Sequence, residues 1–392
     1  MQRFLALIVF FLAVVAGQGS NVLVIPFANR TADAGLDWIG ESLSETIREA
    51  LSAAEVPVVR RQDRQEALHR LALPASGQVT IASAVRMGEA VEASLLVMGQ
   101  FELLTEANGA EAKRSLRVAA RILDLKKVIQ TAGFAQTAPL EDLGRLQSQL
   151  AFEILQTLRP GKAGTREEFD RRHPAVKLTA LENYMRGLMA PNAEQQHRFF
   201  TQAVRMDGRL WQPLYYLGRM HWEKENYREA AGWLERIGPE SPNYGEAMFM
   251  LGISRFQTGD YEGALKTFQS AGTGRYRVEV VNNIGATELR LDRAEEALRD
   301  FQTALEAVPS DPDYHFNVGY ALWKKGVFET AAQRFRAVLD REPEDQDALL
   351  LLGRCLKRSG PRKGDQRMEN LERLKDILED APTSSEPGQQ EK

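Results

Sequence analysis

The first candidate for chemistry is the glycine-containing stretch Asn21 to Gly40, NVLVIPFANRTADAGLDWIG. Gly35 and Gly40 have the spacing of the two glycines in the phosphate-binding loop G-x-x-x-x-G-K-[ST], in which backbone amides cradle phosphates and the lysine neutralises them. Glu41 stands where that lysine belongs. Because a carboxylate repels a phosphate, the sequence argues against a nucleotide site in this stretch.

Residues suited to metal binding or nucleophilic catalysis are scattered. The five histidines are far apart in sequence: His69, His173, His197, His221 and His315. A zinc site needs such ligands clustered, and the spacing shows no cluster. Ser42 and Ser44 lie outside any G-x-S-x-G motif, and carboxylates on the later helices alternate with lysine and arginine, as on a solvated face. We therefore expect no catalytic residue, no metal and no cofactor.

The length of 392 residues predicts more than one domain, since single domains hold roughly 100 to 200 residues. The chain is 43% apolar and 27% charged, which is typical of a soluble globular protein. Its formal net charge of -4 provides no basic field, so we expect no nucleic-acid partner. The single cysteine, Cys355, forbids an intramolecular disulfide and is interpreted as a small apolar residue inside a helix.

The first 17 residues, MQRFLALIVFFLAVVAG, have the pattern of a secretory signal peptide. One cation, Arg3, precedes an apolar run from Phe4 to Val15, and small residues suited to cleavage follow. The run is shorter than the ~20 residues that span a bilayer. We expect a cleaved signal at residues 1–17 and an exported, periplasmic protein; the alternative is an inner-membrane anchor at residues 4–16.

Residues 21–160 are predicted to form an α/β domain with a mixed sheet and helices, in the order β-α-β-α-α-β-β-β-α. Apolar residues recur every three or four positions in the predicted helices and alternate in the later strands. Pro57 cannot donate to a ladder, which places its strand at a sheet edge. The strands are NVLVIPF, Val56–Val59, SLLVMGQFELL, SLRVAARILDL and KVIQTAGFAQT; the helices are Leu36–Leu51, DRQEALHRLAL, TIASAVRMGEAVEA and Leu140–Leu158.

Three stretches of this domain, VLVIPFANRTADAGLDWIGESLSETI, ASLLVMGQFELL and RVAARILDLKKVIQTAGFAQTA, resemble the TolB amino-terminal (FlgO/CsgG-like) domain. The resemblance covers about Asn21 to Leu158 and includes the strand ending in Pro26-Phe27 and the polar corner after it. Such domains also occur beside bacterial cyclases, transcription regulators and repeat proteins. The resemblance implies an interaction or assembly role and no active-site residues.

After a charged linker at residues 161–178, the chain repeats with a period of 33 or 34 residues. Four repeated glycines are followed twelve residues later by alanine and sixteen residues later by Leu234, Phe268, Phe301 and Phe335. The repeat positions are Gly218, Gly252, Gly285, Gly319 and Gly353, with Ala230, Ala264, Ala297 and Ala331. The pattern resembles the tetratricopeptide repeat (TPR), a helix-turn-helix unit that needs small residues where its two helices cross.

The TPR solenoid is predicted to be all-α, with five to six units at residues 179–360. A shortened first unit contains Gly187 and Phe200 and has a turn about three residues short. The last unit contributes Asp347 to Arg358, followed by a capping helix at residues 365–380. Residues 381–392 are polar and are predicted to be disordered.

The first helices of the repeats are expected to line a concave groove that binds a protein or peptide partner. We expect positions three before, one after and four after each repeated glycine to face it, which predicts an aromatic, largely uncharged lining. The predicted groove residues are Tyr215, Arg219, Trp222, Phe249, Phe256, Asn282, Phe316, Tyr320 and Trp323. Trp222 and Trp323 are the strongest candidates for exposure; the alternative is that several rings pack between repeats. Asn282, Asn283 and Asn317 resemble a carboxylate-gripping set, whereas Arg219 and Tyr320 depart from it.

Two classes of function fit these features. In the first, the chain is an exported adaptor or scaffold, with an N-terminal domain docking to a cell-envelope component and a repeat groove holding a polypeptide. In the second, it is a sensor or carrier whose N-terminal domain binds a small molecule. A membrane-anchored assembly factor is a further alternative, through an uncleaved N-terminal segment.

Overall fold

The computed structural model describes residues 21–73, 79–108, 111–271, 277–362 and 365–376. The predicted signal or anchor at residues 1–17 and the predicted disordered tail at residues 381–392 lie outside this range. The chain divides into two compact units, with the boundary between Pro213 and Leu214. An α/β domain is followed by a long run of helices, so the predicted fold class is confirmed.

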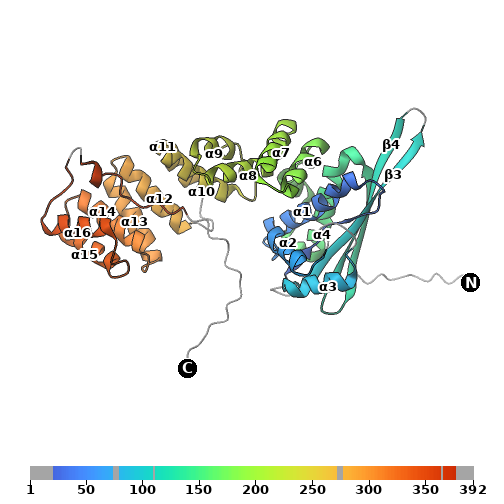
Figure 1. Cartoon of the computed structure of the whole chain (residues 1–392), viewed down its shortest axis with the longest axis horizontal. Coiled ribbons are helices and arrows are strands. Elements are labelled where there is room, and N and C mark those ends of the chain that lie inside the picture. The colour runs from blue at the N-terminus through green and yellow to red at the C-terminus, as the bar shows by residue number, and fades with distance from the viewer. Residues whose placement is uncertain (1–20, 74–78, 109–110, 272–276, 363–364, 377–392) are drawn as a thin grey trace, which may run out of the picture. The chain divides into compact units, whose positions relative to one another are not determined.

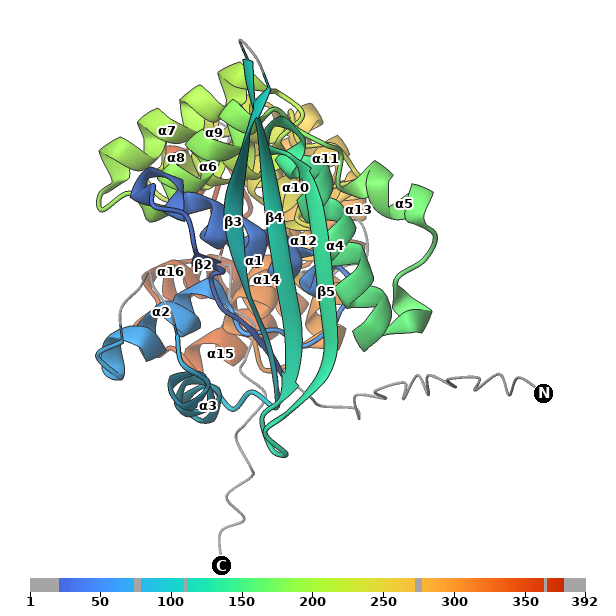
Figure 2. The ribbon, with the colours of Figure 1, turned by 90° about the vertical axis from the view of Figure 1, so that its right-hand side faces the viewer.

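The first unit contains one mixed sheet in the order β1-β3-β4-β5 (Figure 2). β1 and the short β2 both pair with β3 in parallel, and β3, β4 and β5 form an antiparallel meander. The strands are β1 (Val22–Val24), β2 (Ala28–Asn29), β3 (Leu95–Asn108), β4 (Glu111–Asp124) and β5 (Ile129–Pro139). The predicted hairpin after SLRVAARILDL is therefore present, and it has an irregular register between Ile122 and Leu123.

Helices α1 (Asp37–Ala53) and α4 (Leu143–Leu158) pack against each other and lie behind the sheet in Figure 2. The apolar stripe predicted for α1 is buried, and Gln147 Nε2 donates to Ser42 Oγ at 2.5 Å between the two helices. Helices α2 (Arg61–Arg70) and α3 (Ile81–Ala90) complete the domain.

One predicted strand is wrong. Val56–Val59 forms only an isolated bridge, in which Val58 pairs with Val22. Val22 donates its N–H to Pro57 O and accepts from the Val59 N–H, both at 2.9 Å. The missing donor of proline keeps the contact at the sheet edge, as predicted, and only one residue pair, Val22 with Val58, is bridged.

The predicted linker at residues 161–178 is partly helical. It contains a 3-10 turn, η3 (Pro160–Lys162), and helix α5 (Arg166–Arg172). Thr165 and Glu168 form a reciprocal capping box at the start of α5, and the buried ring of Phe169 lies 5.3 Å from that of Phe152. A capped turn with an apolar anchor folds onto the domain even without a sustained hydrophobic period.

Helices α6 (Leu178–Met189) and α7 (Ala193–Met206) belong to the first unit. The Tyr184 hydroxyl of α6 donates to Glu49 Oε1 of α1 at 3.2 Å. A Cβ at Gly187 would lie 2.4 Å from the Phe200 ring, so this shortened pair crosses at its glycine.

The second unit is built from helix pairs. Helix α8 begins before the unit boundary and continues into the second unit. The helices are α8 (Trp211–Trp222), α9 (Tyr227–Leu234), α10 (Tyr244–Gln257), α11 (Tyr261–Ser270), α12 (Arg277–Arg290), α13 (Ala294–Ala307), α14 (Pro312–Lys324), α15 (Phe328–Leu339) and α16 (Gln346–Leu356). Aspartates cap several of them, including Asp311 at α14 and Asp345 at α16.

The repeated glycines lie where the two helices of a pair touch. A Cβ at Gly252 would lie 2.4 Å from Phe268 Cε1, and a Cβ at Gly319 would lie 3.0 Å from Phe335 Cε1. Gly218 and Gly285 contact Leu234 and Phe301 in the same way. Gly353 of α16 has no described heavy atom within 4 Å of its Cβ position. The residue sixteen positions after the glycine therefore fills the space that a side chain would need.

Alanine substitution should have opposite effects on stability at a glycine that touches the second helix and at a glycine with open space around it. We expect Gly252→Ala to lower the free energy of unfolding by about 1–3 kcal/mol, because the buried Phe268 ring must move. Gly353→Ala is the matched control, and it should raise the free energy of unfolding by up to about 1 kcal/mol because alanine favours a helix more than glycine does. Urea titration followed by circular dichroism measures both, and equal shifts would contradict the crossing role.

The predicted capping helix at residues 365–380 is also wrong over the part that the structure describes. A 3-10 turn, η4 (Gln366–Met368), is followed by residues 371–376, which form no helix; residues 377–380 lie outside the described range. In Figure 1 this red end of the chain runs back from α16 past α14 to α12. We call residues 365–376 the C-terminal segment. Side chains of α12 and α14 form hydrogen bonds with backbone groups of this segment. In a helix those groups would bond to one another instead.

Candidate functional site

Asparagines of α12 and α14 hold the backbone of the C-terminal segment. Asn282 and Asn317 each donate from Nδ2 to the Arg373 carbonyl oxygen at 2.8 Å, and the Arg373 N–H donates to Asn317 Oδ1 at 2.7 Å. Asn283 donates to the Lys375 carbonyl oxygen and accepts from its N–H, both at 2.8 Å. A side-chain amide has both a donor and an acceptor, so it can satisfy both backbone groups of an extended residue. These contacts bind two alternate residues whatever their side chains are.

The Arg373 side chain is bound by carboxylates and an aromatic ring. Its Nη1 lies 2.9 Å from Asp313 Oδ1 and 3.8 Å from Glu342 Oε2, and its Nη2 donates to Asp345. Its guanidinium carbon lies 3.8 Å from the centre of the Phe316 ring, a cation-π contact. Burial alone would lower the pKa of Arg373, but the bonds to Asp345 and Asp313 outweigh it and raise that pKa.

Lys375 is bound in a similar way. Its Nζ lies 2.6 Å from Asp313 Oδ2 and 2.9 Å from Asp311 Oδ2, and 5.1 Å from the centre of the Tyr314 ring. Burial lowers the pKa of Lys375, but the hydrogen bonds to Asp313 and Asp311 raise it by more. We call the four carboxylates around these two cations the acidic wall: Asp311, Asp313, Glu342 and Asp345.

Glu372 has a partner of the opposite sign. Its carboxylate accepts from Arg290 Nε of α12, and it is buried. Burial raises the pKa of Glu372 against the lowering effect of Arg290. Arg290 is itself positioned by Tyr261, whose hydroxyl accepts from Nη1 at 3.1 Å, and by the Phe256 ring, whose centre lies 5.1 Å from its guanidinium carbon.

Apolar side chains complete the contact. Met368 is buried, and its carbonyl oxygen accepts from the Tyr320 hydroxyl at 2.8 Å. Leu371 and Leu374 pack against the hydrophobic cluster of the second unit. We call the surface formed by Asn282, Asn283, Arg290, Phe316, Asn317, Tyr320 and the acidic wall the docking face.

Three predicted groove residues contact the C-terminal segment: Asn282, Phe316 and Tyr320. The expected exposure of Trp323 is wrong, since its side chain is fully buried. Its Nε1 donates to Ser359 O at 2.9 Å, and its ring stacks on Tyr320 with centroids 5.9 Å apart. The chain that follows α16 therefore covers the tryptophan.

The other five predicted groove residues contact other side chains of the second unit: Tyr215, Arg219, Trp222, Phe249 and Phe256. The Tyr215 hydroxyl donates to Glu246 Oε1 at 2.6 Å. Phe249 is fully buried, with its ring centroid 6.4 Å from that of Phe268. Trp222 is half-buried against the hydrophobic cluster. Phe249 thus packs within its own repeat, whereas the alternative had such rings packing between repeats.

The surface around the C-terminal segment is charged, unlike the aromatic, largely uncharged lining predicted for the groove. The positions predicted to face the groove lie on one stripe of each first helix. They do not include Asp311 and Asp313 at the start of α14, or Glu342 and Asp345 before α16. A sequence signal was present, because SDPD and EPEDQD place carboxylates at the start of two successive repeats. Helix-capping aspartate accounts for only one carboxylate in each stretch.

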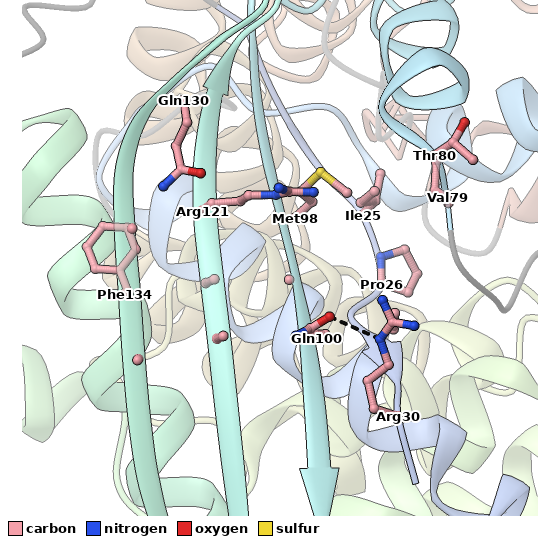
Figure 3. A pocket seen from close by; sticks show the side chains of 16 residues that line it. Ile25, Pro26, Arg30, Val79, Thr80, Met98, Gln100, Arg121, Gln130 and Phe134 are labelled. Carbon is pink, nitrogen blue, oxygen red and sulfur yellow. Dashed lines mark hydrogen bonds between the residues drawn. The ribbon is translucent and has the colours of Figure 1, made fainter. Parts of the chain in front are cut away.

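The first unit contains a hollow of about 690 Å³ above β3, β4 and β5 (Figure 3). Ile25, Met98 and Val79 supply apolar wall, and two guanidinium groups also line it. Arg30 Nε donates to Gln100 Oε1 at 3.0 Å, whereas no carboxylate of the described chain pairs with Arg121. The hollow is therefore mixed in polarity, and its charge is suited to an anion.

Glu41, which occupies the lysine position of the phosphate-loop pattern, lies beside two arginines. Its Oε1 accepts from Arg61 Nε at 2.7 Å and from Arg64 Nη2. Arg64 is only 2% exposed and also donates to Val24 O at 3.1 Å and Ser44 Oγ at 3.2 Å. The carboxylate thus joins α1 to α2 and β1 in the interior.

Among the described residues, no group of three or more histidine, cysteine or acidic side chains is placed to hold a metal ion. Within the same residues, no helix has the length and apolar character needed to cross a membrane. Cys355 is buried, and burial raises the pKa of its thiol to about 11.

Comparison with known proteins identifies the class of the repeats. Tetratricopeptide repeat models match residues 246–272 and 319–360, and a TPR repeat model matches residues 288–326. The chain therefore contains tetratricopeptide repeats, as its glycine period predicted.

Two curated proteins are similar to part of this chain: the cell division cycle protein 16 homologs of Homo sapiens and Mus musculus. Each is 25% identical over 215 residues, which are 49% of this chain and 34% of the relative. The chain thus spans about a third of the length of the curated relatives it matches.

Solved structures show similar partial matches. YrrB, described as a TPR protein with an unusual peptide-binding site, is 20% identical, with 40% of this chain and 82% of YrrB covered and a TM-score of 0.35. MamA from Desulfovibrio magneticus RS-1, from residue 41 to its end, is 20% identical, with 43% and 95% covered and a TM-score of 0.37.

Proposed function

We propose that this chain is an exported, non-catalytic adaptor whose docking face binds an extended polypeptide. The observation that carries the proposal is the two-way hydrogen bonding of Asn283 and Asn317 to backbone groups of the C-terminal segment. A partner's backbone offers the same groups. Protein and peptide binding is also the general role of TPR proteins, and YrrB is described with a peptide-binding site.

The N-terminal α/β domain is proposed to dock to a cell-envelope component. The support is the resemblance of its sequence to the TolB amino-terminal type and the signal-peptide pattern of residues 1–17. In the alternative of a membrane-anchored assembly factor, residues 4–16 stay attached. N-terminal sequencing of the exported protein separates the two, because cleavage gives a start near Gln18.

A second candidate function is favoured by the hollow in the first unit. Its volume of about 690 Å³ and its two guanidinium groups suit a small anionic molecule, which would make the chain a sensor or carrier. Such a ligand would raise the melting temperature of the intact chain, whereas an adaptor without a ligand would not respond.

The adaptor proposal is tested with a capped, fluorescent peptide of residues 365–376, DQRMENLERLKD. The full-length variant Arg373→Ala/Lys375→Ala has a weakened segment of its own, and we expect it to bind this peptide with a Kd of roughly 1–10 µM by fluorescence anisotropy. Adding Asn282→Ala and Asn317→Ala should weaken binding at least about 10-fold, since two amide partners of one carbonyl are lost.

Two controls keep this test interpretable. Tyr320→Phe removes only the hydroxyl that bonds Met368 O, and should weaken binding by roughly 5-fold without disturbing the ring. Circular dichroism melting shows whether each variant is folded. No saturable binding to a folded Arg373→Ala/Lys375→Ala chain would overturn the adaptor proposal.

A further inference from the structure

The docking face presents three side-chain subsites in a fixed order. Arg290 binds Glu372, the acidic wall binds Arg373, and two of its members bind Lys375. Leu374, between the two cations, packs against the hydrophobic cluster without a charged partner. In an extended chain, alternate side chains point to the same side, so Arg373 and Lys375 reach one wall while Glu372 turns to the opposite cation.

The charges on the two sides are complementary. Four carboxylates of the acidic wall face two cations of the C-terminal segment, and one guanidinium faces its one buried carboxylate. Asp313 bonds both Arg373 and Lys375. A segment with acidic residues in place of those two cations would put like charges against the wall, at a cost that the backbone hydrogen bonds do not offset.

We infer that the docking face selects partner segments with the extended pattern Glu-Arg-x-Lys, and that the chain's own C-terminal segment is a built-in competitor for such a partner. This inference rests on the proposed function and adds to it a sequence preference for the partner and a means of regulation. The segment belongs to no helix or strand at residues 371–376 and is bonded by side chains of α12 and α14, so it can leave without unfolding a repeat, while Met368, Leu371 and Leu374 give up their contacts with the hydrophobic cluster. Its release frees the backbone-binding asparagines and the acidic wall together.

The effective concentration of the C-terminal segment decides how strongly it competes with a partner. A segment tethered to the repeats acts at a high effective concentration, of order millimolar for a short linker. A partner with the same pattern must therefore bind more weakly to the wild-type chain than to a chain whose own segment is weakened. Multivalent or locally concentrated partners would overcome this competition first.

The test uses the intact chain and three capped peptides. They are the peptide of residues 365–376, the same peptide with Arg373→Glu and Lys375→Glu, and the same peptide with Glu372→Lys. For the Arg373→Ala/Lys375→Ala chain, we expect the double reversal to weaken binding roughly 100-fold and the single reversal roughly 10-fold. Wild-type chain should bind the unaltered peptide at least about 10-fold more weakly than the variant.

A matched control removes two cations elsewhere. Lys266→Ala/Arg336→Ala changes two exposed residues of α11 and α15 and should bind the unaltered peptide as weakly as wild type does. Hydrogen exchange should report faster exchange at residues 371–376 in Arg373→Ala/Lys375→Ala but not in this control.

The outcomes distinguish the selectivity of the docking face, the competition by the C-terminal segment and the adaptor function. Equal affinity for all three peptides would overturn the Glu-Arg-x-Lys selectivity and leave the adaptor proposal standing. Equal affinity of wild type and Arg373→Ala/Lys375→Ala would overturn the competition. Absence of binding to any peptide would instead overturn the adaptor proposal itself.

Discussion

Replacing Gly40 with alanine is expected to lower the free energy of unfolding of the first unit by at least about 3 kcal/mol. A Cβ at Gly40 would lie 2.1 Å from the Phe27 carbonyl oxygen and 3.1 Å from its carbonyl carbon. Carbon and oxygen atoms are in contact at roughly 3.3 Å, so the overlap is severe. The neighbour is backbone, and no change of side-chain rotamer relieves it.

The contact cannot open without a further loss. The Phe27 N–H donates to the Gly40 carbonyl oxygen at 3.1 Å, which holds α1 against the chain that follows β1. Any shift of α1 also displaces Ile39 and Leu43, which are fully buried. The missing side chain is thus what lets the helix lie directly on the strand end.

Urea titration of the full-length chain, with hydrogen exchange of peptides from α1 to localise the effect, measures this prediction. Gly232→Ala in α9 is the matched control, because no described heavy atom lies within 4 Å of its Cβ position. That control should be neutral or stabilising by up to about 1 kcal/mol. A Gly40→Ala chain within about 0.5 kcal/mol of wild type would contradict the close approach.

The second large effect is expected at Arg64, where we predict that Arg64→Met costs about 3–5 kcal/mol of unfolding free energy. Methionine keeps much of the apolar volume but removes the donors to Glu41, Val24 O and Ser44 Oγ. The Glu41 carboxylate then keeps Arg61 as its partner and loses its buried one. The carboxylate is then less well compensated in the interior, and the oxygen atoms of Val24 and Ser44 lose a donor as well.

A double-mutant cycle isolates this pair. Glu41→Gln removes the charge, so Arg64→Met should cost about 1–3 kcal/mol less in that background than in the wild type. Arg70→Met is the control on the same helix, because Arg70 and Glu66 are 3.9 Å apart with side chains 63% and 69% exposed. It should change stability by at most about 0.5 kcal/mol. Strictly additive effects of the two interior substitutions would show that Glu41 and Arg64 are not coupled.

Much of the fold was predictable because its signals are local. The buried stripe of α1 follows from a helical period, and the alternating strands β4 and β5 follow from a period of two. The repeat was predictable because each unit crosses its helices at one glycine, and the residue sixteen positions later fills that space. Even the shortened unit kept the match between Gly187 and Phe200.

Only part of the candidate site was predictable. Asn282, Phe316 and Tyr320 were identified because the repeat register sets which side of a first helix they occupy. The acidic wall was missed because its members lie at helix starts and in a connection, outside that register. Trp323 was expected to be exposed because the chain that covers it comes from beyond α16.

The sequence by itself determined most of the helices and strands and the TPR period, since neighbouring residues decide which faces are apolar. The tertiary structure decided the conformation of residues 371–376, whose pattern also suits a helix. Their backbone partners, Asn282 and Asn283, are 91 and 92 residues away from Arg373 and Lys375. Local sequence preference cannot predict hydrogen bonds between residues so far apart in the chain. Here those bonds and the ion pairs with the acidic wall stabilise the segment more than a helix would.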